Sequence, residues 1–384
     1  MLNENKEREL AYIVKVDDVE PIEGYDRIRY ATVKGWHCVV GLDVQPGDLC
    51  VYFEIDSLLN KEDPRFAFCE KYHYKIKNQK YCKGTKLSQG LLMPVKDFPE
   101  LEGKKEGYFC TKDLKVTYYD PMDNQRKGRS GGAETTQLFK KLKGHFPFKQ
   151  MMRTNWGRKL LLKIFGLQKK KRRWPEFVPK SDEERIQNMP WILQNKTAFE
   201  CTEKVDGCSS TYAIQKKRFG KPEIWVCSRN VVLERKTKAF YDFNVWFEMF
   251  DKYHIEDFLN DFLKKTGAEW VYLQGESFGD GIQKRNYSLE NGGHDFRAFI
   301  LCTSNRVRYT YEETKELLEP YGIPTVPIID KSYTLPDTVE DLLNYAAGAS
   351  EIDGLPREGI VFRNVDDPTI SFKAVDNAFL DKYH

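Results

Sequence analysis

One short string of the sequence has the residue types of a covalent nucleophile. In Glu203-Lys204-Val205-Asp206-Gly207 a lysine stands two residues before an Asp-Gly pair. An Asp-Gly pair is typical of a turn, because glycine adopts backbone conformations that other residues avoid. Taken alone, the string has two interpretations. It is either a hairpin turn beside a solvated lysine, or a nucleophilic lysine at the end of a strand with room for a bound nucleotide.

The second interpretation places a requirement on the surroundings of the lysine. An amine attacks phosphorus only when it is neutral, and the ordinary pKa of lysine is about 10.4, so bringing that pKa near neutrality costs about 4 kcal/mol. Nearby positive charge or removal from water lowers the pKa of a lysine. A divalent metal ion that accompanies a triphosphate would supply the charge, and carboxylates would hold that ion through its water ligands.

Suitable carboxylates and cations follow the lysine in a fixed order. Glu276 ends one predicted strand, Glu358 precedes another, and Lys373 lies in a strand from which it would neutralise phosphate charge. Arg229 closes a further strand and offers donors to a ribose or a phosphate. Each short string alone is more typical of structure than of function. Their ordered occurrence over about 170 residues, however, resembles the motif set of covalent nucleotidyltransferases.

The C-terminal half of the chain resembles the catalytic domain of ligases that form a lysyl-AMP intermediate. Residues 275–284 and 295–299 are similar to the phage T4 RNA ligase 2 family. Residues 182–188 and 10–59 resemble ATP-dependent RNA ligases of the Naegleria and Deinococcus type, in which an OB domain precedes the catalytic domain. The resemblance covers most of the chain except residues 119–180.

The resemblance implies a role for each motif residue, with ATP and Mg²⁺ or Mn²⁺ as cofactors. Lys204 would be the adenylated nucleophile, and Lys373 would contact the α-phosphate. Glu276 and Glu358 would bind the ribose or the waters of the metal ion. The other nucleotide-binding residues that it implies are Glu203 at the adenine amino edge, Arg229 at the sugar, Phe299 stacked on adenine, Arg185 at the phosphates or the 5′ end, and Asp206.

Two of these positions have a second interpretation. Many relatives carry two lysines spaced Lys-x-Lys in the last motif, whereas this chain has Ser371 before Lys373. The resemblance therefore does not identify the group that orients the leaving pyrophosphate. Phe299 also fits an ordinary structural role, since an aromatic residue in a buried strand usually belongs to the core.

The implied reaction joins a 3′-hydroxyl and a 5′-phosphate end of RNA, as in the repair of nicks or breaks. DNA ligases and mRNA capping enzymes share the motifs, but they carry an OB domain after the last motif, and here only 11 residues follow Lys373. A catalytically inactive RNA-binding relative is the remaining alternative. The intact set of Lys204, Glu276, Glu358 and Lys373 argues against it.

The elements around these motifs indicate an α+β fold with two domains and an insert. Residues 1–118 are expected to form an OB-type β-barrel, with short strands at 11–19, 27–33, 49–55, 91–95 and 107–116. Residues 181–384 are expected to form an antiparallel-sheet nucleotidyltransferase domain, with strands at 198–214, 223–228, 270–275, 296–303, 359–363 and 369–374 and helices at 240–265, 312–319 and 339–346. The string Thr310-x-x-Glu313 predicts a capping box at the second helix.

The insert at 119–180 differs from both domains in its charge. The whole chain has a net charge of +3, yet residues 120–180 hold 17 Lys or Arg against 4 Asp or Glu. Such a segment favours an anionic partner, most simply RNA. A solvated insert with a basic helix at 151–167, or a nuclear localisation signal at 169–173, is the alternative.

The remaining composition indicates where the protein acts. The chain has no apolar run long enough for a membrane span, and its nine cysteines lack the spacing of a metal site. We therefore expect an intracellular monomer, cytoplasmic or nuclear, with no membrane contact.

Overall fold

The computed structural model describes residues 8–119, 148–151, 154, 156–157, 160, 173–179, 182–235, 241, 243–289, 292–306 and 308–383. Residues 1–118 and 174–384 together form one compact unit, and residues 119–173 form a second. The second unit contains α3 (Phe148–Met151). The basic helix expected at 151–167 and the basic run at 169–173 lie almost entirely outside the described residues.

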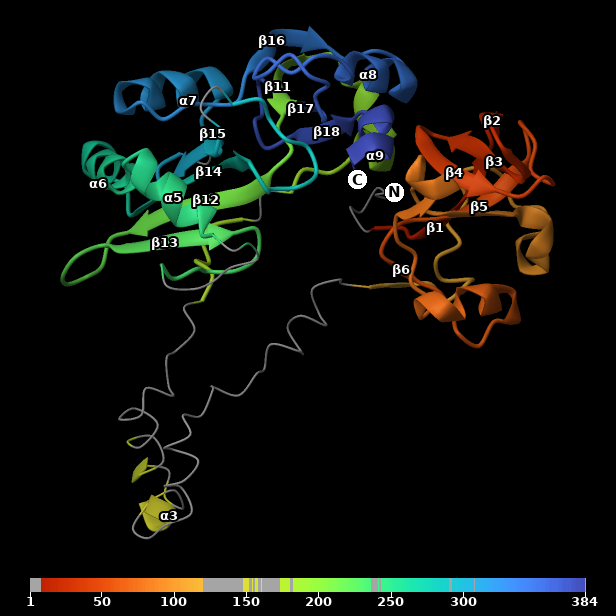
Figure 1. Cartoon of the computed structure of the whole chain (residues 1–384), viewed down its shortest axis with the longest axis horizontal. Helices are drawn as coiled ribbons and strands as arrows, with labels where there is room; N and C mark the ends of the chain where they lie inside the picture. The colour runs from red at the N-terminus through yellow and green to blue at the C-terminus, as the bar shows by residue number, and fades with distance from the viewer. Residues whose placement is uncertain are drawn as a thin grey trace. The chain divides into compact units, whose positions relative to one another are not determined.

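The N-terminal region of the first unit contains two three-stranded antiparallel sheets (Figure 1). Their strand orders are β1-β5-β9 and β2-β3-β4, and two short pairs, β6 with β10 and β7 with β8, flank them. The strands are β1 (Ala11–Lys15), β2 (Asp18–Ile22), β3 (Tyr25–Val33), β4 (Trp36–Val40), β5 (Leu49–Phe53), β6 (Ser57–Leu58), β7 (Gln79–Tyr81), β8 (Lys86–Ser88), β9 (Leu91–Pro94) and β10 (Thr117–Tyr118).

Both of these sheets contribute to one apolar core. Tyr12 and Tyr52 from the first sheet are buried together with Trp36 from the second. The rings of Tyr12 and Tyr52 meet edge to face, with their centroids 5.5 Å apart. Because successive strand residues point to opposite faces, Ile13 and Phe53 join a second cluster on the other side of the first sheet. Two sheets closed around a shared interior form the barrel-like domain that the strand pattern predicted.

Several strands in this region differ from the expected ones. The run at 11–19 is divided between β1 and β2, and the run at 107–116 forms only an isolated bridge from Phe109 to β1. Strand β4 was not predicted. Its sequence signal is the pair Lys34-Gly35, whose φ angles of 48° and 78° form the tight turn between β3 and β4.

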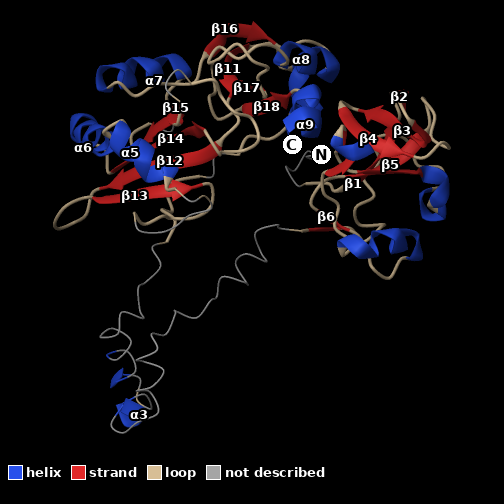
Figure 2. Ribbon diagram, viewed as in Figure 1, coloured by secondary structure: helices blue, strands red, loops and turns tan. Residues whose placement is uncertain are grey.

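The C-terminal region contains two four-stranded antiparallel sheets with helices against them (Figures 1 and 2). The strand orders are β16-β11-β17-β18 and β13-β12-β14-β15. The strands are β11 (Ala198–Lys204), β12 (Cys208–Gln215), β13 (Glu223–Ser228), β14 (Trp270–Gly279), β15 (His294–Thr303), β16 (Ile328–Thr334), β17 (Gly359–Asn364) and β18 (Ser371–Val375). The helices are α5 (Val245–Lys252), α6 (Ile255–Thr266), α7 (Tyr311–Leu318), α8 (Val339–Ala346) and α9 (Asn377–Tyr383).

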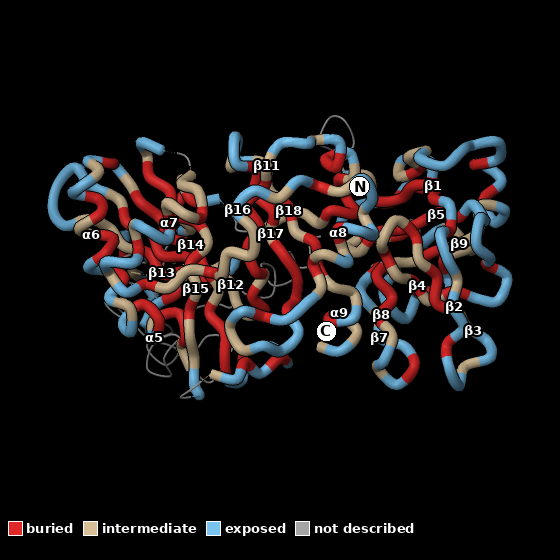
Figure 3. Tube along the Cα trace, turned by 90° about the horizontal axis from the view of Figure 1, so that it is seen from above, coloured by how far each residue is buried: buried red, intermediate tan, exposed pale blue. Residues whose placement is uncertain are grey.

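Helices α5 and α6 cover one face of the second sheet and share its apolar core. The strands are mostly buried, whereas the connecting loops are largely exposed (Figure 3). A single helix was predicted over 240–265, but the chain leaves the helix after α5. His254 takes a left-handed φ of 47° before α6 begins, and no glycine or proline marks this break. No helix in the described part of the chain is long and apolar enough to cross a membrane.

Two further features define this region. Helix α7 begins with the predicted capping box, in which the Thr310 hydroxyl accepts from the Glu313 amide and the Glu313 carboxylate accepts from the Thr310 amide. The compact unit resumes at Trp174. The ring of Phe177 stacks on Trp270 at 5.0 Å, so the chain packs on the second sheet before residue 181, where the composition had placed the boundary.

Candidate active site

The register of the first C-terminal sheet places two of the predicted site residues on one face. Lys204 pairs with Gly359, and Thr202 pairs with Val361, which in turn pairs with Lys373. Directly paired residues of an antiparallel sheet point to the same face, and side chains alternate along each strand. Lys204 and Lys373 therefore share a face, while the opposite face forms an apolar core with α8.

Lys204 is the last residue of β11, and its amine is held by the carboxylate of Glu358, which directly precedes β17. Its Nζ donates to Oε2 of Glu358 at 2.6 Å, and the side chains are 23% and 8% exposed, respectively. Burial lowers the pKa of Lys204, but the negative charges of Glu358 and Glu276 outweigh burial, so the pKa is raised overall. The amine is therefore charged in the protein alone. It becomes a nucleophile only when another cation offsets these carboxylates.

Glu276 approaches the same amine from the second sheet, where it pairs with Ser209 of β12. Burial raises the pKa of Glu276 to about 8; Lys204 opposes this rise, whereas Glu358 and Asp206 add to it. Three carboxylates thus act on one another around a single lysine. This excess of negative charge in a buried place is the condition under which a cation binds.

The donor set fits a hydrated divalent ion better than a metal enclosed by protein ligands. Within the described ranges, no group of three or more His, Cys, Asp or Glu side chains is arranged to hold a metal ion by itself. Mg²⁺ usually keeps several of its waters and is bound by one or two carboxylates together with substrate phosphates. Glu276 and Glu358 offer that number of ligands.

A glycine allows the two sheets to meet at this place. A Cβ atom on Gly207 would overlap the carbonyl oxygen of Ser277 and would lie 3.0 Å from Cγ of Glu276. The glycine of the Lys-x-Asp-Gly string is therefore required for the close approach of β14. Gly207 has no positive φ, so the close approach of the strands, and not a left-handed backbone, requires glycine here.

Lys373 and Arg229 are brought together by an acidic residue that the sequence reasoning missed. Lys373 Nζ donates to Oδ1 of Asp182 at 3.0 Å, and Arg229 pairs with the other oxygen of that carboxylate. Burial lowers the pKa of Lys373; Asp182 opposes this effect, and Lys204 adds to it. Asp182 stands in a segment without regular structure, so no periodic pattern marked it.

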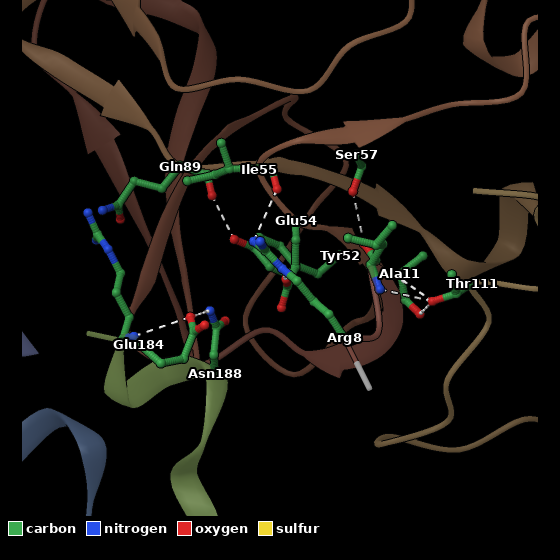
Figure 4. A network of polar contacts seen from close by, with 12 residues as sticks. Arg8, Ala11, Tyr52, Glu54, Ile55, Ser57, Gln89, Thr111, Glu184 and Asn188 are labelled. Carbon is green, nitrogen blue, oxygen red and sulfur yellow. Dashed lines mark hydrogen bonds and ion pairs between the residues drawn. The ribbon is translucent and has the colours of Figure 1, made fainter. Parts of the chain in front are cut away.

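Arg185 joins this segment to the N-terminal domain. Its guanidinium lies 5.3 Å from the ring centroid of Trp36, and its Nη1 is buried without a hydrogen-bond partner. Burial also lowers the pKa of Arg185. In Figure 4, Glu184 and Asn188 are hydrogen-bonded to each other in the same segment. The structure thus presents Arg185 as a half-buried cation with one buried donor atom that has no hydrogen-bond partner.

The two residues that were predicted to contact adenine, Glu203 and Phe299, both make contacts within the protein. Glu203 is 1% exposed, and its carboxylate accepts from the Ser350 hydroxyl and from the Glu351 amide. These two hydrogen bonds connect the loop after α8 to β11, the strand that carries Lys204. Phe299 lies where the pairing of β14 and β15 shifts register, and it packs partly buried in the cluster of Val205. A β-bulge of this kind changes the direction in which a side chain such as that of Phe299 points. Adenine contacts by Glu203 and Phe299 remain predictions.

Ser371, which stands where many relatives carry a lysine, belongs to a separate polar network. The Ser371 hydroxyl donates to Oε2 of Glu183 at 2.5 Å, and Nη1 of Arg308 donates to the Ser371 hydroxyl at 3.3 Å. Arg308 therefore places a cation beside the position where relatives carry a lysine. Sequence reasoning could not find it, because Arg308 stands alone between β15 and α7 without a motif.

The raised pKa of Glu276 predicts how stability depends on pH. The pKa is about 8 in the folded protein, against an ordinary value of about 4.3, so folding favours the protonated carboxyl. The stability associated with this group is present below pH of about 4.3 and is lost as the pH rises through about 8. In EDTA we expect Glu276→Gln to have the Tm of the wild type near pH 5 and a higher Tm near pH 9. Thermal unfolding measures this, and an unchanging difference in Tm would contradict it.

Family comparisons agree with this two-domain organisation. Residues 197–375 match the RNA ligase family, and residues 10–95 match an OB-fold domain family. No curated protein sequence matches the chain significantly. The chain is similar to the solved structure of a mutant Naegleria gruberi RNA ligase with AMP and Mn, at 28% identity and a TM-score of 0.63, over 98% of this chain and 99% of that one. The same ligase with PPi, and another mutant with ATP and Mn, match at 28% identity and a TM-score of 0.62, with the same coverage of both chains.

Proposed function

We propose that this chain is an RNA ligase with an OB domain ahead of the catalytic domain, and that it joins RNA ends through AMP held on Lys204. The observation that carries the proposal is the Lys204 amine, placed 2.6 Å from Glu358 and on the same sheet face as Lys373. ATP is the adenylate donor, with Mg²⁺ or Mn²⁺. The ends joined are a 3′-hydroxyl and a 5′-phosphate, and the enzyme acts inside the cell as a monomer.

In the first step the Lys204 amine forms a bond to the α-phosphorus of ATP, and the bond to pyrophosphate breaks. Oε2 of Glu358 already accepts a hydrogen bond from this amine, so it is placed to take the ammonium proton. A divalent ion held through its waters by Glu276 and Glu358 would supply the positive charge that offsets the carboxylates and the phosphates. The reaction otherwise depends on positioning and charge neutralisation.

The remaining cations are suited to the phosphates. Lys373 shares the face of Lys204, and Arg185 has a buried donor without a partner. Asp182 holds Lys373 and Arg229 together, and a phosphate group would compete with that carboxylate for both cations. AMP then passes to the 5′-phosphate of RNA, and the 3′-hydroxyl of the other end displaces it.

A sealing assay with four nicked duplexes tests the proposed substrate. Each duplex carries RNA or DNA on the 3′-hydroxyl side and RNA or DNA on the 5′-phosphate side. An enzyme that reads 2′-hydroxyls near the reacting end should seal at least about tenfold faster when the 3′-hydroxyl strand is RNA. Equal rates on the all-DNA nick would favour a DNA ligase instead.

The basic insert gives a second prediction, although most of it lies outside the described residues. Deletion of residues 125–175 removes a large share of the positive charge of the chain. If the insert binds phosphates, RNA binding should weaken, and its log–log slope against salt should flatten by about 0.9 for each duplex phosphate that is no longer neutralised. Self-adenylation should remain within about twofold of the wild type, since none of the proposed site residues is removed. Equal salt slopes for the two proteins would exclude the phosphate-binding role.

A further inference from the structure

The N-terminal domain concentrates its positive charge in one segment. Residues 71–86 contain six lysines, three tyrosines and no acidic residue. The rest of residues 1–118 contains 13 Lys or Arg and 20 Asp or Glu. A basic segment within an otherwise acidic domain, with aromatic residues interleaved, is typical of nucleic-acid binding. We call residues 71–86 the Lys–Tyr segment.

Four lysines of this segment are exposed to an external anion. Lys71, Lys77, Lys80 and Lys83 are exposed, and none of them forms a salt bridge with a carboxylate in the described part of the chain. Elsewhere on the domain, other basic side chains such as Arg65 are ion-paired. Lys80 also donates to the backbone carbonyl of Asp381 at 3.5 Å. Cations that are not neutralised by a carboxylate leave a positive potential at the surface, which attracts phosphates.

Two tyrosine rings are exposed among these lysines. Tyr72 is 39% exposed and Tyr81 is 38% exposed. The Lys71 amine lies 4.8 Å from the ring centroid of Tyr72. Burial raises the pKa of Tyr81; Tyr72 raises it further, and Lys71 lowers it, so the three side chains interact electrostatically. Rings beside cations are the arrangement on which unpaired bases stack while the cations contact their phosphates.

The backbone of the segment is held in unusual conformations. Four residues, His73, Tyr74, Cys82 and Lys83, have φ angles between 54° and 60°, a backbone region that residues other than glycine rarely adopt. The first two follow the 3-10 helix η1 (Pro64–Tyr72), and the last two form the turn between β7 and β8. Such conformations persist only where the surrounding structure fixes them, and they gather at ligand-binding sites.

The segment is also attached to the catalytic domain close to the proposed phosphate contacts. Leu87, which directly follows it, is buried with Val375 and Leu380. The Leu87 amide donates to Oδ1 of Asp381 at 2.9 Å. Val375 is the last residue of β18, two positions after Lys373. An RNA strand on this surface would therefore lie near the end of the strand that carries one of the site cations.

From these features we propose that the Lys–Tyr segment binds unpaired RNA, with Tyr72 and Tyr81 stacking on bases and the exposed lysines contacting phosphates. The proposal rests on the proposed function and extends it to RNA that is single-stranded beside the ends to be joined. Single-stranded RNA is the favoured form because a ring face is reached only by a base that has left the duplex stack. A surface that served only duplexes would need the lysines but not the rings.

The rings are tested in the full-length protein by RNA binding without ATP. Fluorescence anisotropy with end-labelled single-stranded RNA compares the wild type with Tyr72→Ala/Tyr81→Ala and with Tyr72→Phe/Tyr81→Phe. The alanine pair should weaken binding by roughly tenfold for each ring removed, whereas the phenylalanine pair keeps the rings and should stay within about twofold. Unchanged binding by the alanine pair, or an equally large weakening for blunt duplex RNA, would overturn the proposal.

The lysines are tested by the dependence of binding on salt. Lys71→Gln/Lys77→Gln/Lys80→Gln/Lys83→Gln should flatten the log–log slope for single-stranded RNA by about 0.7 for each phosphate that is no longer neutralised. Lys105→Gln/Lys112→Gln changes exposed lysines of the same domain outside the segment and should leave the slope unchanged. The same slope in both variants would also overturn the proposal. Self-adenylation is measured separately, so failure of the ligase function itself would be recognised by the absence of adenylate on the wild type.

Discussion

Lys204→Ala is expected to reduce transfer of AMP from ATP to the protein below detection, a decrease of at least about a thousandfold. The physical reason is that the bond to phosphorus forms on this amine. Among the described residues, no other lysine combines a carboxylate contact at 2.6 Å with a position where two sheets meet. The measurement is gel analysis of the protein after incubation with α-labelled ATP and magnesium.

A second substrate separates the loss of the nucleophile from the loss of the site. RNA that already carries AMP on its 5′-phosphate needs no attack by lysine, so Lys204→Ala should seal it within about tenfold of the wild-type rate. The variant should also fold, because Lys204 lies at the end of β11 and is 23% exposed. Labelling that persists in the variant would show that another residue carries the adenylate.

Glu358→Gln has the second largest expected effect, and its direction distinguishes two roles of this residue. If Glu358 served only to keep Lys204 charged, its removal would lower the pKa of the amine and speed adenylation near neutral pH. If instead it accepts the proton and holds the metal through water, adenylation slows. We expect a slowing of about 10²- to 10³-fold, comparable to the loss of one preorganised polar group in other active sites.

Single-turnover adenylation between about pH 6.5 and 9.5, at several magnesium concentrations, decides between these roles. Glu351→Gln is the matched control, since Glu351 is an exposed residue nearby whose amide contacts Glu203 through the backbone. The control should keep the wild-type rate. A rate for Glu358→Gln above that of the wild type at neutral pH would contradict the proposed role.

The sequence predicts which residues come together where the motifs lie on strands that pair directly. Lys204 and Lys373 are separated by most of the catalytic domain, yet the register of β11, β17 and β18 places them on one face. Alternating side chains make this possible, because one face becomes the core and the other is left for chemistry. The two-domain fold with the barrel in front could be predicted for the same reason, from short strands with regular turns.

Other parts of the site leave no such pattern. Asp182 and Arg308 stand outside helices and strands, so their roles depend on contacts that only the folded chain reveals. The adenine contact of Glu203 stays a prediction, and the hydrogen bond that its carboxylate accepts from the Ser350 hydroxyl was not foreseen. The break between α5 and α6 is fixed by packing at His254 and has no turn residue. Tertiary contacts decide each of these features.

Peptide mass spectrometry of the wild-type protein, after incubation with ATP and magnesium at neutral to alkaline pH, shows directly whether Lys204 carries AMP. We expect one added adenylate, located on the side chain of Lys204, which disappears when pyrophosphate is supplied and the reaction runs backwards. Protein that carries no adenylate, or that carries it on Lys373 or another residue, would contradict this expectation.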